Sequence, residues 1–95
     1  MEKMMSIREF GEDVCQYVKA GLPSELEAAE VFTARLDMGD GDTHIALLII
    51  RPWNKETTGF YLDGWYIRYI SGDITVESAA ADIINDRRLY NAAIE

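Results

Sequence analysis

Residues 31–51 read VFTARLDMGDGDTHIALLIIR, and this stretch decides the fold. Its first eight residues have the period-two alternation of a half-buried β-strand. One predicted face holds Phe32, Ala34, Leu36 and Met38, and the other holds Val31, Thr33, Arg35 and Asp37. Residues 39–42 form a turn, because glycine and aspartate tolerate positive φ. Residues 43–51 predict a second strand that is apolar on both faces and therefore central, so the two strands form an antiparallel hairpin.

A helix precedes the hairpin, and its start is well marked in the sequence. Ser6 and Glu9 form a capping box, in which the serine oxygen accepts the Glu9 amide and the glutamate reaches back. Apolar residues then recur at helical spacing on one face, at Ile7, Phe10, Val14, Tyr17 and Val18. Gly21 and Pro23 end this helix, and residues 24–27 predict a second, short one.

The segment after the hairpin begins with Pro52, which stops the second strand. Residues 60–62 predict a short third strand. Asp63 and Gly64 are ambiguous, since Asp-Gly between apolar runs is a strong hairpin signal. Apolar side chains nevertheless recur at helical spacing, at Leu62, Trp65, Tyr66, Tyr69 and Ile70. We favour a short helix that is capped by Asp63 and closed by Gly72.

The last predicted element is a helix capped by Thr75. Its apolar stripe runs along Val76, Ala79, Ala80, Ile83 and Ile84 and extends toward Tyr90. The chain of 95 residues therefore predicts one α+β domain over residues 1–95. We expect an N-terminal helix, an antiparallel hairpin or small sheet of two to three strands, and two C-terminal helices. Area scaling buries about 65% of the unfolded surface, which suffices for one core but not for a deep, enclosed active site.

The net charge is −8, from 17 acidic and 9 basic residues, and ten of the acids lie within residues 1–42. A field of this sign repels nucleic acid and anionic membranes, so we expect neither as a direct partner. It attracts a protein with a basic surface, although charge of this size also serves the solubility of a small domain.

The number of cysteines and the hydropathy of the chain indicate the cellular compartment in which we expect the protein. The single cysteine, Cys15, excludes an internal disulfide and any multi-cysteine zinc site. Charged residues rather than an apolar run follow the first methionines, so no signal peptide is expected. The longest apolar run, residues 45–50, is too short to cross a bilayer. We expect a cytoplasmic protein.

Catalytic chemistry has few candidates. A nucleophilic dyad would need Cys15 beside His44, the one histidine, and a buried free cysteine is the ordinary alternative. Asp37, Asp40 and Asp42 crowd the turn and could offer oxygen ligands to calcium, but turn chemistry explains them without a metal. We therefore expect no catalytic, cofactor-binding or metal-binding residues, and a protein that is not an enzyme. A cleft with perturbed carboxylates would argue for an enzyme instead.

Spaced aromatic residues carry a family resemblance. The pattern Phe60-Tyr61-Leu62-Asp63-x-x-Tyr66-x-x-Tyr69-x-x-Gly72-Asp73, followed by an amphipathic helix, resembles an uncharacterised family of bacterial domains common in Gram-positive anaerobes. The resemblance covers residues 31–90. It departs at residues 38–42, where the family usually has a lysine-asparagine-asparagine-glycine turn. The resemblance implies an α+β order and no assigned activity.

Two non-enzymatic functions remain. The first is an acidic protein that docks on a basic nucleic-acid-binding surface, as phage or mobile-element inhibitors of the anti-CRISPR or anti-restriction type do. The second is a self-associating interaction module, for example a homodimer, that uses aromatic residues or a free strand edge. The candidate partner-binding residues are Glu25, Glu27, Glu30, Asp37, Asp40, Asp42, Trp53 and Trp65.

Overall fold

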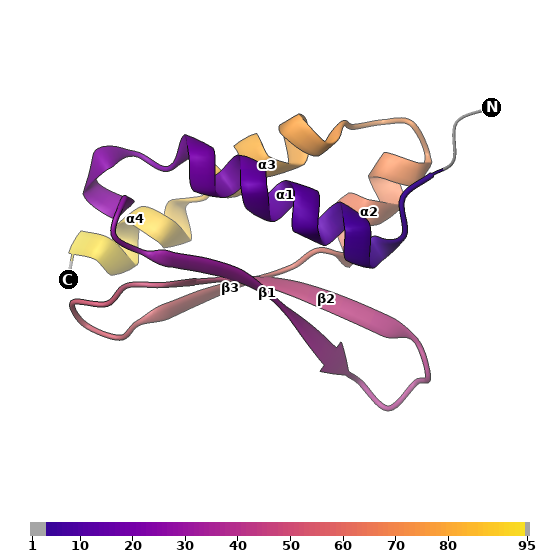
Figure 1. Cartoon of the computed structure of the whole chain (residues 1–95), viewed down its shortest axis with the longest axis horizontal. Coiled ribbons are helices and arrows are strands. Elements are labelled where there is room, and N and C mark those ends of the chain that lie inside the picture. Colours follow the sequence, from indigo (N-terminus) through magenta and orange to yellow (C-terminus); the bar gives the residue numbers. More distant parts are fainter. Residues whose placement is uncertain (1–3, 95) are drawn as a thin grey trace.

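The computed structural model describes residues 4–94 and has the α+β order that the sequence predicts. Three antiparallel strands form one sheet in the order β1-β2-β3. Helices lie along one side of it (Figure 1). The elements are α1 (Ile7–Gly21), the 3₁₀ turn η1 (Ser24–Leu26), β1 (Glu30–Asp37), β2 (Thr43–Ile50), β3 (Thr57–Tyr61), α2 (Asp63–Ile70), α3 (Val76–Ile84) and α4 (Arg87–Ile94).

The predicted hairpin is confirmed, with β2 as the central strand. β1 pairs with β2 so that Val31 is opposite Ile49 and Asp37 is opposite Thr43. The connecting turn contains two glycines with positive φ, Gly39 and Gly41. The third strand starts three residues earlier than the predicted one and pairs with β2 on the other side.

The helices cover the face of β1 opposite to the one that the apolar alternation favours. Directly opposed residues of an antiparallel pair point to the same face, so Val31 and Thr33 share a face with Ile49 and Leu47. On that face Val31, Leu47 and Ile49 are buried and Thr33 is half-buried, while Phe32 remains 39% exposed and Met38 is also exposed. The alternation in β1 is therefore correct, but packing of α1 on β2 decides which set is buried.

The N-terminal helix packs closely on the sheet. Its capping box between Ser6 and Glu9 is present as predicted. Gly11 lies at the closest approach, where an added Cβ would be 3.0 Å from Ile45 Cγ2 and 3.3 Å from Leu62 Cδ1. The side chains that α1 buries are Phe10, Val14, Cys15 and Val18.

Asp63 and Gly64 open a helix rather than a hairpin, and Gly72 closes it with a φ of 82°. The capping role predicted for Asp63 is wrong, because Leu62 is the N-cap residue and makes no side-chain cap. The Asp63 carboxylate instead accepts a hydrogen bond from His44 on β2. The cap at Thr75 on α3 is confirmed.

The stripe that extends toward Tyr90 is divided between two helices. α3 ends at Ile84, and Asp86 Oδ1 accepts the backbone N–H of Arg88 to start α4. Arg51, directly after β2, is fully buried beneath α4 and donates to Leu89 O and Thr58 Oγ1 at 2.8 and 3.0 Å. These hydrogen bonds hold α4 against β3. The described part of the chain therefore has three helices after the sheet instead of the predicted two.

Candidate functional site

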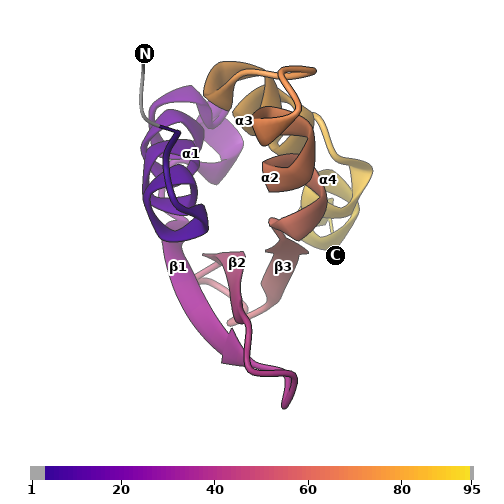
Figure 2. The same cartoon turned by 90° about the vertical axis from the view of Figure 1, so that its right-hand side faces the viewer.

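All four α-helices lie on one side of the sheet, and no described helix or strand covers the other side (Figure 2). The strand pairings place a set of alternate residues on that uncovered side. We call this set the open face. It consists of Glu30, Phe32, Ala34, Leu36, His44, Ala46, Leu48, Ile50, Thr57, Gly59 and Tyr61.

Two rows cross the middle of the open face. The first row holds Phe32, Leu48 and Gly59, which are paired side by side on β1, β2 and β3. The second row holds Ala34, Ala46 and Tyr61, paired in the same way. On every strand, therefore, one row has a large residue and the other a small one. The large residue is in the first row on β1 and β2 and in the second row on β3. Gly59 leaves room for its neighbour, since an added Cβ there would lie 3.2 Å from Leu48 Cδ2.

The open face is apolar where a solvated face is usually polar. An antiparallel sheet with one covered face normally alternates apolar and polar residues. In β2 both faces are apolar, because Ala46, Leu48 and Ile50 alternate with the buried Ile45, Leu47 and Ile49. On the open face Leu48 and Ile50 are half-buried, and the small Ala46 is 4% exposed between its larger neighbours. Of the predicted site residues only Glu30, at one end, belongs to this surface, and its apolar middle was not predicted. The signal that could have found it is the uninterrupted apolar run at residues 45–50, combined with a chain too short to supply a second layer of helices.

One end of the open face carries a histidine between two carboxylates. His44 Nδ1 is 2.5 Å from Asp63 Oδ2, and His44 Nε2 is 2.8 Å from Asp40 Oδ2. The hydrogen bond to Asp63, and then that to Asp40, raises the pKa of His44 above its ordinary value. The pKa of Asp40 is lowered, mainly because its carboxylate accepts the backbone N–H of Asp42 and then because of His44. The cluster is an ion-pair network that joins the β-hairpin to the start of α2.

The six predicted acidic residues do not form one surface. Three of them lie before or at the start of β1, and the other three lie at its far end and in the following turn. The length of β1 separates the two groups by about 23 Å. Their members are Glu25, Glu27 and Glu30 in one group, and Asp37, Asp40 and Asp42 in the other. All six are exposed, but Asp37 and Asp40 also accept backbone N–H groups within the turn, which supports the structural interpretation of the turn.

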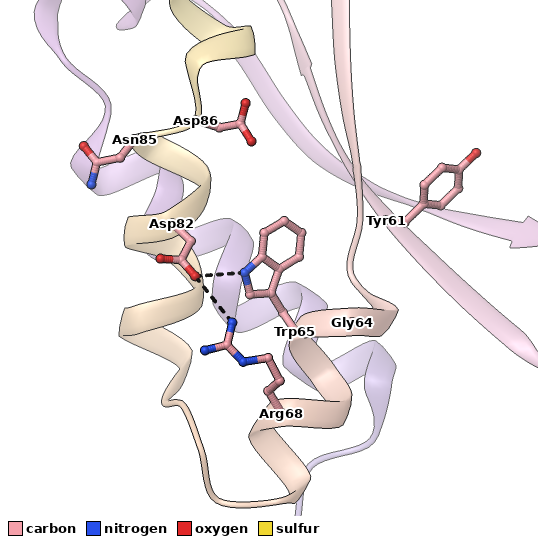
Figure 3. A pocket seen from close by; sticks show the side chains of 7 residues that line it. All are labelled: Tyr61, Gly64, Trp65, Arg68, Asp82, Asn85 and Asp86. Atoms are coloured by element: carbon pink, nitrogen blue, oxygen red, sulfur yellow. Dashed lines mark hydrogen bonds and ion pairs between the residues drawn. The ribbon is translucent and has the colours of Figure 1, made fainter.

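The two predicted tryptophans have different environments. Trp53 lies in the loop after β2 and is 50% exposed. Trp65 is half-buried and lines an open groove of about 650 Å³ between α2 and α3 (Figure 3). Its indole Nε1 donates to Asp82 Oδ2 at 3.1 Å, and Arg68 Nη1 lies 4.0 Å from the same oxygen. Trp65 therefore helps to join α2 to α3.

A cysteine-histidine dyad is not formed. Cys15 is buried between α1 and the covered face of the sheet, where its thiol donates to Val31 O, and burial raises its pKa. His44 lies on the opposite face. Among residues 4–94, no group of three or more histidine, cysteine, aspartate or glutamate side chains is arranged to hold a metal ion. In the same range, no helix is long and apolar enough to span a membrane.

Comparisons with known proteins found no match: no family model, no curated protein and no solved structure is significantly similar to this chain. The resemblance to an uncharacterised bacterial family therefore stays a prediction.

Proposed function

We propose that this chain is a non-enzymatic protein-binding module that acts through the open face of its sheet. The observation that supports it is the combination of apolar side chains and missing cover on that face. A sheet that is apolar on both sides is normally covered on both sides. An exposed apolar patch of this kind is typical of protein interaction sites.

The dimensions of the open face favour a macromolecular partner. Strand spacing and rise give an area of about 15 by 25 Å in the plane of the sheet. Small-molecule sites are instead concave pockets that enclose most of the ligand. Phe32 and Tyr61, which are 39% and 64% exposed, are aromatic side chains of the kind enriched at interface centres. The single buried thiol, Cys15, is consistent with a cytoplasmic location, which we include in the proposal.

The test is site-specific photo-crosslinking in cells that express the chain. A benzophenone amino acid replaces Phe32 on the open face, and in a matched control it replaces Ile67, which is 59% exposed on α2. We expect covalent protein adducts from position 32 and few or none from position 67. Equal adducts from both positions, or none from position 32, would refute the open face as a binding surface.

A second candidate is the acidic inhibitor that docks on a basic nucleic-acid-binding surface. It is favoured by the net charge of −8 and by the exposed carboxylates of Asp37, Asp40 and Asp42 at the tip of the hairpin. Such docking weakens steeply as salt rises, because it depends on charge attraction. A partner whose affinity is insensitive to salt would exclude this candidate. The triple variant Asp37→Asn, Asp40→Asn and Asp42→Asn should also lose that partner, whereas Phe32→Ala should retain it.

A further inference from the structure

We propose that the occupant of the open face is a second copy of this chain, stacked sheet on sheet. This inference rests on the proposed function and identifies its partner. The two copies are related by a two-fold axis that lies midway between the two sheets. The axis runs across the strands, parallel to the rows, and passes between the two central rows. Each strand then lies over the same strand of the second copy, and the first row of one copy lies over the second row of the other.

The alternation of side-chain size carries this inference. In the proposed arrangement Phe32 lies over the second copy's Ala34, and Leu48 lies over its Ala46. Gly59 lies beneath the second copy's Tyr61. On all three strands a large side chain of one copy faces a small residue of the other, because the rows exchange large and small residues on every strand. A two-fold interface uses the same patch twice and must be complementary to itself, and this pattern meets that requirement.

The charge distribution permits the same arrangement. The two central rows contain no charged side chain. The carboxyl and imidazole groups of the open face lie at its ends, with Glu30 at one end and His44 at the other. Stacking would therefore bury the apolar rows without desolvating an unpaired charge. The assembly would resemble an aligned β-sandwich, with sheets about 10 Å apart and helices outside.

The area of the open face indicates how tightly two copies are expected to bind. The open face covers about 360 Å² in the plane of the sheet, from three strands of eight residues at most. Exposed side chains such as Phe32 and Tyr61 present more surface than this flat area, so a pair of copies buries roughly 1,000 Å² in total, the low end for specific interfaces. We therefore expect a reversible dimer with a dissociation constant in the micromolar range. Because each copy carries a charge of −8, repulsion opposes dimerisation, and salt should strengthen it by screening.

The experiment is sedimentation equilibrium of the full chain and four variants across a wide range of concentration. Ala34→Phe places two phenylalanines over each other at two symmetric positions, and it should weaken dimerisation at least about tenfold. Phe32→Ala removes the large side chain and should also weaken it. The double variant Phe32→Ala with Ala34→Phe restores a large residue opposite a small one, and it should regain most of the wild-type affinity. Circular dichroism confirms that each variant remains folded, and Ile67→Ala serves as an exposed control on α2.

The outcomes separate this inference from the proposed function. A monomer at every concentration, with crosslinks from position 32 to a different protein, would overturn the second copy and leave the binding module intact. A dimer that Ala34→Phe does not weaken would refute sheet stacking and indicate pairing elsewhere, for example at the free edge of β1. A crosslinked species of twice the chain mass from position 32, lost when Ala34→Phe is added, would support the inference. So would a sedimentation dimer that Ala34→Phe weakens and that the double variant recovers.

Discussion

Leu47 and Leu48 are adjacent in β2, yet the structure predicts very different consequences for their replacement by alanine. Leu47 is fully buried between the sheet and the helices, whereas Leu48 is half-buried on the open face beside Gly59. Leu47→Ala should cost about 3–5 kcal/mol of unfolding free energy, because a well-packed core only partly collapses around the cavity. A chain of this length has a total stability of about 5–14 kcal/mol, so this variant should lose a large part of it.

Leu48→Ala should behave differently. Its side chain is already partly in water and contributes little to the core, so we expect a loss of about 1 kcal/mol or less in the monomer. The assay is urea unfolding followed by circular dichroism, at a concentration well below that of self-association. Sedimentation at high concentration then shows whether Leu48→Ala weakens the dimer. Equal costs for the two variants would refute the assignment of the open face, since they would mean that both sides of β2 are covered.

Three further predictions concern pH, glycine geometry and salt. The raised pKa of His44 means that its ion pairs with Asp40 and Asp63 stabilise the fold fully below pH 6.5, and that this contribution is lost as pH rises through the raised value. His44→Gln should remove that part of the pH dependence in thermal unfolding, and an unchanged profile would contradict the network. Gly72→Ala should destabilise the chain by about 1–2 kcal/mol, because Gly72 has a φ of 82°. Gly64→Ala should instead stabilise α2 by up to about 1 kcal/mol, since an added Cβ has open space there, and chemical denaturation measures both shifts. Raising salt should strengthen self-association but weaken any complex with a basic partner, and titrations at several ionic strengths distinguish the two functions.

Several parts of the fold could be predicted because their signals are local. The capping box at Ser6 and Glu9 and the cap at Thr75 each involve residues three apart, so the backbone geometry follows from neighbouring side chains. The glycine at position 72 closes α2 for an equally local reason. The order of helix and strands was therefore predictable from hydrophobic periodicity and from the capping, glycine and proline residues between the elements.

The errors occurred where a distant residue competes with a local signal. Asp63 could have capped α2, but His44, nineteen residues earlier, holds its carboxylate instead. The apolar stripe of the last helix gave no sign of a break, yet Asp86 starts a new helix and buried Arg51 anchors it. The candidate site was missed for the same reason, since acidic and aromatic residues were selected by composition rather than by position on the sheet.

Local sequence signals were enough to predict the hairpin, its central strand, the first helix and the helix after Asp63, because hydrophobic period, caps and turn residues act over a few positions. The sequence also determined that β2 is apolar on both faces. Which of those faces the helices cover could not be predicted from local signals, since both faces are apolar enough to be buried. On the covered face Gly11 of α1 packs against Ile45 and Leu62, which are far apart in the chain. The register of three strands then brought Phe32, Leu48 and Gly59 into one exposed row, which no local pattern contains.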